Sequence, residues 1–192
     1  LINAVYGFTR ILLNVLNELK PEYVIVAFDK KGPTFRHKEF KKYKAHRPEM
    51  DEELAGQIAR VKEVVSTLGI PYYAKENYEA DDLIGAFCQQ ARNWSKVKGQ
   101  RSKVKKSLET VIVSSDKDLL QLLNGAVKVY FPKRGKRPAK IVQKSDFEDE
   151  YGFPVKYFVD YKALIGDPSD GLPGVKGIGP KTAARLITKY AT

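Results

Sequence analysis

The chain has 192 residues, 43% of them hydrophobic, and its 34 Lys and Arg against 23 Asp and Glu give a net charge of +11. One cysteine and two histidines exclude a disulfide framework and argue against a Cys-based or His-rich metal centre. The longest uninterrupted apolar run, at 23–28, is too short to span a membrane. We expect one good core, with or without a small appendage. The positive charge favours a polyanionic partner, most simply nucleic acid, over a basic protein without one.

Hydrophobic periodicity predicts helices that alternate with strands. The expected helices are 3–20, 50–68, 78–91 and 154–165, and the expected strands are 23–28, 70–74, 111–114 and 127–131. Ser145 and Glu148 form a predicted capping box before a further short helix, and a helical tail punctuated by Gly and Pro follows at 166–192. This alternation predicts an α/β fold with a mostly parallel central sheet and helices on both faces.

Three basic segments are candidates for phosphate contact. The segments 94–107 and 133–144 each hold six Lys or Arg and no acid, and we expect both to be flexible loops, either simply solvated or in contact with a partner. The segment 36–47 also holds six, together with Phe40 and Tyr43. Basic residues interleaved with aromatic ones suit a phosphate backbone with exposed bases, and a plain surface helix is the alternative.

Carboxylates bunch in four places, at the ends of predicted strands or at the starts of helices and loops. They are Asp29; Glu79, Asp81 and Asp82; Asp116 and Asp118; and Asp167 and Asp170. In a mostly parallel sheet, ligands bind outside the carboxyl ends of the strands, so we expect these groups to converge. Each acid taken singly is equally consistent with a helix cap or a surface charge.

Such a cluster needs divalent cations, because two unit charges about 4 Å apart repel by roughly 4 kcal/mol at an effective dielectric near 20. Oxygen ligands without His or Cys select Mg²⁺ or Mn²⁺ rather than zinc. Two such ions are a common device for phosphodiester hydrolysis, in which one activates water and the other stabilises the leaving oxygen. The cluster therefore predicts a two-metal phosphodiesterase.

The segment 172–187, LPGVKGIGPKTAARLI, predicts a turn followed by a helix. The glycines Gly177 and Gly179 suit a tight turn, and Pro180 suits the first position of a helix whose N–H groups can bind phosphate. With Lys176 and Lys181 beside the turn, this segment looks like a helix-hairpin-helix, a clamp for the DNA backbone. An ordinary αα-hairpin is the alternative.

Five motifs occur in this order: VAFD, FRHKEFKKYKAHRPEM, YEADD, SSDKDLLQLL and GDPSDGLPGVKGIGPKTA. Together they resemble the 5′→3′ exonuclease domains of bacterial DNA polymerases I, members of the flap endonuclease family with a PIN-like fold. The resemblance implies a catalytic domain at 1–165, with a basic helical arch near 36–51, and a helix-hairpin-helix at 166–192. It implies structure-specific 5′→3′ exonuclease and 5′-flap endonuclease activity in replication and repair, with two Mg²⁺ or Mn²⁺ ions.

The resemblance also assigns roles by position. The tighter metal site matches Glu79, Asp81 and Asp116, with Asp29 and Asp82 beside it, and the second site matches Asp118, Asp167 and Asp170. In the arch, Lys44 and Arg47 match residues that contact the scissile phosphate, Arg36 belongs to the same DNA-binding segment, and Tyr43 resembles an aromatic on which a terminal base stacks. The DNA contacts expected in the hairpin, where a K⁺ ion assists in the family, are Lys176, Gly177, Gly179, Lys181 and Thr182.

The implied partners are DNA with 5′ flaps or free 5′ ends, RNA-primer duplexes and a polymerase domain that follows in the native chain. The implied state is a monomer in the bacterial cytoplasm, with no membrane. The family's first strand, whose terminal Asp is central to its metal site, would precede Leu1, so we expect that carboxylate to be missing here. Gly171 stands where the family usually has Asn, and the 94–107 insertion is unusually basic.

Two alternatives remain at this point. Without the carboxylate of the first strand, the chain would be a binding module that holds branched DNA without cutting it. A PIN-type ribonuclease shares the acidic strand ends, but it would lack the hairpin and show no preference for a duplex junction.

Overall fold

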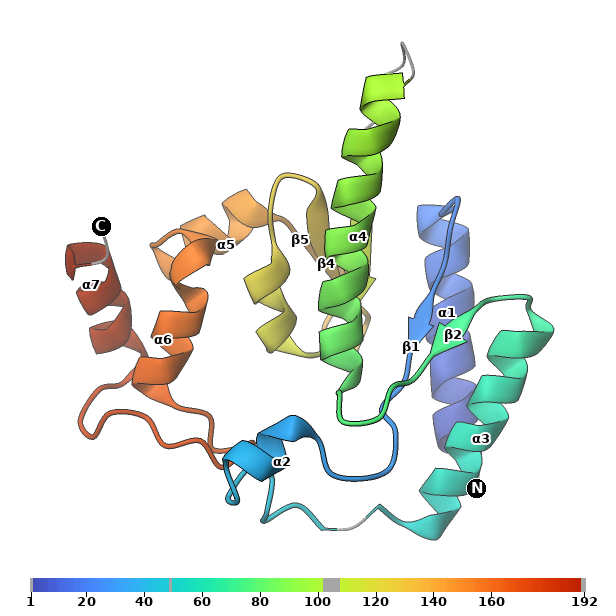
Figure 1. Ribbon diagram of the computed structural model, residues 1–192, viewed down its shortest axis with the longest axis horizontal. Helices are drawn as coiled ribbons and strands as arrows, with labels where there is room; N and C mark the ends of the chain where they lie inside the picture. The colour runs from blue at the N-terminus through green and yellow to red at the C-terminus, as the bar shows by residue number, and fades with distance from the viewer. Residues whose placement is uncertain (1, 49, 102–107, 191–192) are drawn as a thin grey trace. The chain divides into compact units, whose positions relative to one another are not determined.

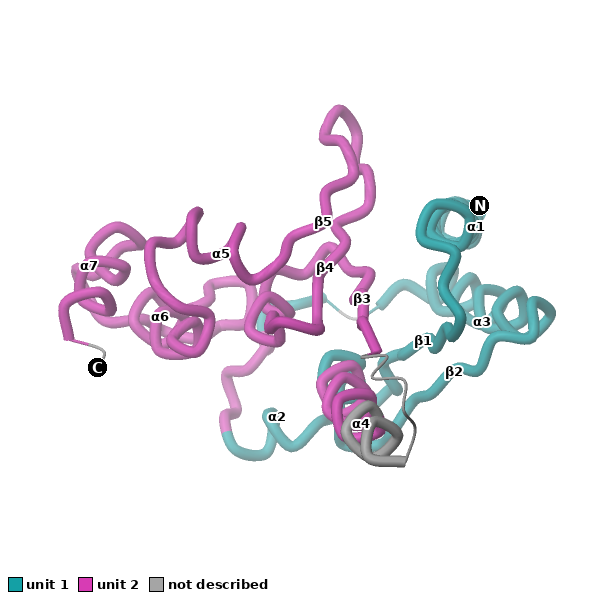
Figure 2. Tube along the Cα trace, turned by 90° about the horizontal axis from the view of Figure 1, so that it is seen from above, with its two compact units in different colours: residues 1–39, 46–83 teal, residues 40–45, 84–192 magenta. Residues whose placement is uncertain are grey.

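The computed structural model describes residues 2–48, 50–101 and 108–190 (Figure 1). It confirms the α/β class. The chain divides into two compact units, each described by itself below (Figure 2). Unit 1 comprises Leu1–Glu39 and His46–Leu83, and unit 2 comprises Phe40–Ala45 and Ile84–Thr192. Within the described residues, no helix is both long and apolar enough to cross a membrane.

Unit 1 is built on two helices, α1 (Asn3–Leu19) and α3 (Glu52–Thr67), which pack against each other. Their contact buries Leu12, Val61 and Val65, as the predicted apolar spacing requires. Asp51 caps α3, since its side chain accepts a hydrogen bond from the Glu53 N–H at 2.7 Å. The predicted bounds of both helices hold to within a few residues.

The strands of unit 1 are shorter than the sequence suggests. β1 (Val26–Ala27) pairs in parallel with β2 (Tyr72–Tyr73), and α2 (Phe35–Glu39) follows β1. The predicted strand over 23–28 is wrong at its start, because the strand begins only at Val26 and the side chains of Tyr23 and Ile25 are 68% and 48% exposed. A strand extends only as far as its partner, and β2 offers two residues.

Unit 2 contains a three-stranded sheet in the order β3-β4-β5. The strands are β3 (Thr110–Val113), β4 (Val127–Phe131) and β5 (Lys140–Val142). β3 and β4 are parallel, as predicted, whereas β5 is antiparallel to β4. The described strands thus form two small sheets rather than one central sheet. The expected loop at 133–144 is wrong in part, because β5 lies in it and pairs with β4.

Helix α4 (Ala80–Arg101) continues beyond its predicted end at residue 91. The first part of the basic segment 94–107 is therefore helical rather than a loop, and the rest, 102–107, lies outside the described residues. The helix continues because the segment has no proline and is rich in Lys, Arg and Gln, which are good helix formers. After β3, a 3₁₀ helix, η1 (Lys117–Leu122), precedes β4.

An aromatic cluster forms part of the core of unit 2. Phe147, fully buried, stacks on Tyr151 with ring centroids 4.4 Å apart and meets Phe153 and Phe158 edge to face. The rings of this cluster come from α5 (Lys144–Tyr151), α6 (Phe158–Ile165) and the segment between them, which contains η2 (Val155–Tyr157). The last helix, α7 (Pro180–Tyr190), lies in the tail.

The capping box of α5 is not the predicted one. It is formed by Gln143 and Asp146, whose side chain accepts a 3.0 Å hydrogen bond from the Gln143 N–H. The predicted pair of Ser145 and Glu148 lies inside the helix. The helix starts two residues earlier than the pattern suggests because β5 ends at Val142 and leaves Gln143 extended.

Candidate active site

In unit 1, the predicted metal-binding carboxylates gather at the start of α4. Asp29, exposed after β1, accepts a 2.7 Å hydrogen bond from the Ala80 N–H. Ala80 is the first residue of α4, and the first N–H groups of a helix have no partner within it. The carboxylate of Asp29 therefore ties the end of one strand to the start of a helix that is distant in the sequence.

Asp82 is held from two sides. Its Oδ2 accepts a 2.9 Å hydrogen bond from the Glu79 N–H, one half of a capping box. Both of its oxygens also accept from the guanidinium of Arg36, at 2.8 and 2.7 Å. Glu79 lies 3.9 Å from the same guanidinium, and Asp81, half-buried, follows in the first turn of α4. One Arg36 side chain thus serves as the cation for two of the predicted ligands.

In unit 2, the counterpart of this arrangement is a lysine. Lys162, in α6, donates to Asp118 Oδ1 at 2.8 Å and to Asp167 Oδ2 at 2.6 Å. Asp118 belongs to η1, and Asp167 lies in the loop after α6. Segments far apart in the sequence are therefore joined through one ammonium group. Two predicted ligands of the second metal site do converge, and they share a positive charge.

The remaining two aspartates are linked to this pair through the backbone. Asp116 caps η1, and its Oδ1 accepts a 2.8 Å hydrogen bond from the Asp118 N–H. The Asp170 N–H donates to the Asp167 carbonyl at 3.2 Å. Ser169 donates its hydroxyl to Asp167 Oδ1 at 2.6 Å and so fixes the rotamer of that carboxylate.

These contacts shift the pKa values of Asp167 and Lys162. Partial burial by itself would raise the pKa of Asp167. Hydrogen bonds from Lys162 and Ser169 to the carboxylate outweigh the effect of burial and lower this pKa to about 2. Partial burial likewise disfavours the ammonium of Lys162, yet hydrogen bonds and charges from Asp118 and Asp167 raise its pKa above the ordinary value. At neutral pH Asp167 is therefore ionised beside a charged Lys162.

The donor chemistry of these residues fits a hard divalent cation. All eight predicted ligands are carboxylates, and Asp118 and Asp167 already reach one cationic group together. In 2–48, 50–101 and 108–190, no set of three or more His, Cys, Asp or Glu is arranged as a complete metal cage. Several of the carboxylate oxygens instead accept hydrogen bonds from the side chains of Arg36 and Lys162 or from N–H groups at the start of a helix.

The predicted helical arch is only partly helical. Its helix, α2, ends at Glu39, and Lys44 adopts a left-handed φ of 53°, which does not continue a helix. The Lys44 N–H donates to the Asp170 carbonyl at 2.9 Å, and its ammonium lies 4.8 Å from the centre of the Tyr43 ring. Arg47 is exposed. The prediction that Tyr43 offers its ring for base stacking is not supported, because the residue is 5% exposed.

The predicted DNA contacts of the tail lie around the start of α7. The helix begins at Pro180, as predicted, and Gly177 has a φ of 83°. Gly179 accepts a 2.9 Å hydrogen bond from the Ala183 N–H through its carbonyl. Lys176 and Lys181 are exposed, and Thr182 is half-buried in the first turn. The turn and the helix start match the expected form, whereas their role in binding stays a prediction.

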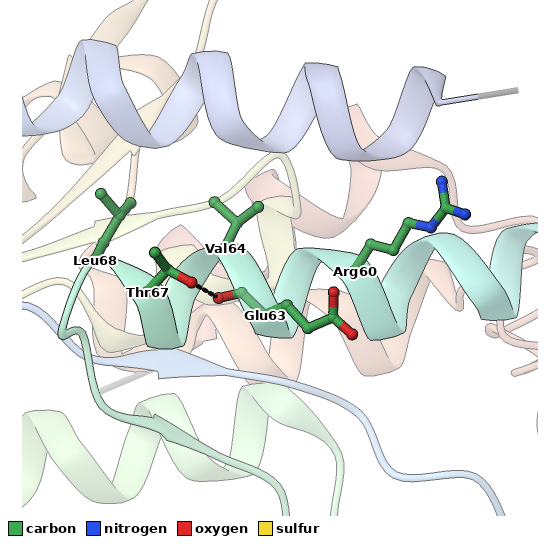
Figure 3. Close-up of a pocket in the computed structure, with 5 residues that line it drawn as sticks. All are labelled: Arg60, Glu63, Val64, Thr67 and Leu68. Atoms are coloured by element: carbon green, nitrogen blue, oxygen red, sulfur yellow. Dashed lines mark hydrogen bonds between the residues drawn. The ribbon is translucent and has the colours of Figure 1, made fainter.

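A surface hollow of about 400 Å³ lies along α3 (Figure 3). Arg60, Glu63, Val64, Thr67 and Leu68 line it, and the Thr67 hydroxyl donates to the Glu63 carbonyl at 2.8 Å. It contains none of the predicted site residues. Its one acid and one base come from the same helix face, so it offers no constellation for catalysis.

The sequence interpretation missed two features of the site. The sequence holds one signal for Lys162, which stands five residues before Asp167 in a helix that ends at Ile165. The close approach of Gly166 and Gly174 was also missed. A Cβ on Gly174 would lie 2.6 Å from the Gly166 N, so the loop after α6 folds back against the end of that helix.

Comparisons with known proteins agree with the motifs. Residues 1–152 match the family model "5'-3' exonuclease, N-terminal resolvase-like domain", and residues 153–192 match "5'-3' exonuclease, C-terminal SAM fold". The chain is 40% identical over 192 residues to DNA polymerase I of Caldicellulosiruptor bescii, a match that covers 99% of this chain and 21% of that protein. The chain therefore spans about a fifth of the length of this relative.

Two solved structures have a similar fold. The T5 D15 protein, co-crystallised with metal ions, is 20% identical with a TM-score of 0.73, over 98% of this chain and 68% of that one. The catalytic core of Rad2 in complex with DNA substrate is 21% identical with a TM-score of 0.60, over 98% of this chain and 53% of that one.

Proposed function

Because the chain belongs to the 5′-3′ exonuclease family, we propose that it is the nuclease part of a longer protein and hydrolyses phosphodiester bonds in DNA at free 5′ ends and 5′ flaps. RNA-primer duplexes are included in the proposed substrates. We place the catalytic region at 1–165 and a DNA-binding helix-hairpin-helix at 166–192, in a protein that acts as a monomer and continues into a polymerase.

The observation that carries this proposal is the sharing of one cation by Asp118 and Asp167. Carboxylates from separate segments do not approach a common point without a positive charge between them, because their repulsion would drive them apart. Lys162 holds Asp118 and Asp167 near one another, and the local cap on η1 holds Asp116 next to Asp118, so three aspartates of the family motifs lie close together.

We propose that the eight carboxylates hold two divalent ions of the Mg²⁺ or Mn²⁺ type, and that K⁺ assists the hairpin. Bound divalent ions would activate water and stabilise the leaving oxygen. The residues of the chain have separate tasks. Lys44 and Arg47 are proposed to neutralise the scissile phosphate, and Arg36 to orient the acids at the start of α4. The exposed Lys176 and Lys181 are proposed to contact the duplex backbone.

The test uses a labelled 5′-flap duplex with Mg²⁺ and two variants. Asp116→Asn keeps a good helix cap while it removes the negative charge, so the fold is preserved. We expect this variant to bind the flap and lose cleavage. Asp149→Ala, which removes an exposed carboxylate from α5, should cleave as the parent does. Equal cleavage by Asp116→Asn and the parent would remove the site assignment.

Two outcomes favour the alternatives. If the parent binds the flap and forms no product with Mg²⁺ or Mn²⁺, the chain is a binding module. If the parent cuts single-stranded RNA as fast as the DNA flap, the ribonuclease interpretation holds instead.

A further inference from the structure

The connection between β4 and β5 is a tight turn with a concentrated positive charge. Four of the five residues at 133–137 are Lys or Arg, and the fifth is Gly135. Arg134 and Arg137 exchange two backbone hydrogen bonds, N–H to carbonyl at 3.1 and 3.0 Å, around a two-residue turn. Gly135, at the first central position, has a φ of 58°, the left-handed value that such a hairpin turn requires.

This turn is fixed to the sheet. Phe131 pairs with Lys140 at the end of the β4–β5 ladder, and Val129 and Val142 beside it are buried. Pro132 and Pro138 flank the turn, and their rigid rings limit its freedom. Figure 2 shows the connection between β4 and β5 projecting away from the rest of unit 2. The charges are therefore presented on a structured hairpin rather than on a free loop.

Within the described residues, no acid neutralises the charges of the turn. All four basic residues, Lys133, Arg134, Lys136 and Arg137, are exposed, and in the described part of the chain none of them forms an ion pair. Lys140 at the base of the hairpin differs, because Glu150 lies 3.8 Å from its ammonium. The segment 133–144 contains no acid of its own. The tip of the hairpin thus offers its full charge to a partner.

The chemistry of the tip favours a phosphate backbone. Arg134 and Arg137 are directly opposite in an antiparallel pair, so their side chains project from the same face with Cα atoms about 5.5 Å apart. Two guanidinium forks so placed suit the closely spaced phosphates of a nucleic-acid strand, about 3.4 Å of helix rise each. The tip carries no aromatic residue for base stacking and no large apolar residue for insertion into a bilayer.

We propose that the β4–β5 hairpin, through Arg134 and Arg137 with Lys133 and Lys136, binds the phosphate backbone of nucleic acid without sequence preference. This contact is separate from the proposed helix-hairpin-helix and from the acidic residues. It rests on the proposed function only in taking DNA as the polyanion, and it requires no cleavage.

The test compares two double variants that each remove two exposed arginines. Arg134→Ala with Arg137→Ala alters the hairpin, and Arg10→Ala with Arg60→Ala alters α1 and α3 of unit 1. Binding of a labelled DNA duplex is measured by fluorescence anisotropy over a series of salt concentrations. We expect the hairpin variant to lose about tenfold in affinity. The slope of log K against log salt should become less steep by about 2, because each lost phosphate contact reduces the slope by roughly 1. The matched control should keep the parent slope.

Further measurements separate the possible failures. Arg134→Lys with Arg137→Lys should retain most of the slope, since the charges remain, and thermal melting should be unchanged in all variants. Equal slopes for the hairpin variant and its control would overturn the inference and leave the proposed function standing. Loss of binding to phosphatidylserine vesicles with unchanged DNA binding would overturn it in favour of a membrane. A parent that does not bind duplex DNA even at low salt would overturn both proposals.

Discussion

The guanidinium of Arg36 and the carboxylate of Asp82 form a two-point ion pair, with N···O distances of 2.8 and 2.7 Å, that joins α2 to the first turn of α4. Their side chains are 32% and 21% exposed, so water screens the pair only in part. Planar two-point contact is the geometry in which Arg and a carboxylate interact most strongly. The pair sits beside Glu79 and so connects the stability of unit 1 to the arrangement of its predicted ligands.

We expect a double-mutant cycle of Arg36→Met and Asp82→Asn to give a coupling energy of about 1 kcal/mol, because the pair is partly shielded and doubly hydrogen-bonded. Asn keeps an oxygen for the Glu79 N–H, so the start of α4 is retained. Urea unfolding of the parent, the two single variants and the double variant measures the coupling. Additive effects of the two substitutions would show that the pair contributes no interaction energy.

Lys162 supplies the positive charge between Asp118 and Asp167, and its removal leaves two carboxylates facing each other. We expect Lys162→Met to lower the free energy of unfolding in EDTA by about 1–2 kcal/mol. A divalent ion can replace the lost charge, so Mg²⁺ should raise the Tm of this variant more than that of the parent. Lys156→Met, which removes an exposed lysine of η2, is the matched control. An equal Mg²⁺ effect on Lys162→Met and the parent would show that the ammonium and the ion do not compete.

Gly174 lies against the end of α6 in a way that admits no side chain. A Cβ there would be 2.5 Å from the Ile165 carbonyl oxygen and 2.6 Å from the Gly166 N. We expect Gly174→Ala to destabilise the protein by about 3 kcal/mol, because rigid backbone must move to relieve the overlap. Gly179→Ala, where nothing lies within 4 Å, should change stability by less than about 1 kcal/mol. Chemical denaturation of both variants measures the difference, and similar losses would contradict the close approach.

Cys88 lies in the core of unit 2 at 8% exposure, and burial raises the pKa of its thiol. The thiolate is the reactive form, so a raised pKa leaves less of it at any given pH. We expect alkylation of the native protein by iodoacetamide to be at least about tenfold slower than in concentrated urea. The reaction of the native protein should accelerate only at a pH above the pKa of a free thiol. Mass spectrometry of timed samples gives both rates. Rapid modification of the folded chain at neutral pH would show that the thiol is accessible.

The sequence by itself determined those elements whose cause is local. β4 has its predicted bounds because Val127–Phe131 is rich in β-branched and aromatic residues, which favour strands, and α7 starts at Pro180 because proline fixes the backbone at that position. α1 follows its apolar spacing from Asn3. The acidic motifs likewise identified the family, because a motif is a property of neighbouring residues.

Only the tertiary structure decided the features that depend on distant partners. The extent of β1 was set by the two residues of β2, and the capping of α5 by Gln143 was set by where β5 stops pairing. Tyr43 is buried although its neighbours in the sequence are basic. Lys162 meets two carboxylates that lie forty-four residues before it and five residues after it. Hydrogen bonds and ion pairs act over a few ångströms in space, and no periodicity of the sequence records which segments the fold brings that close.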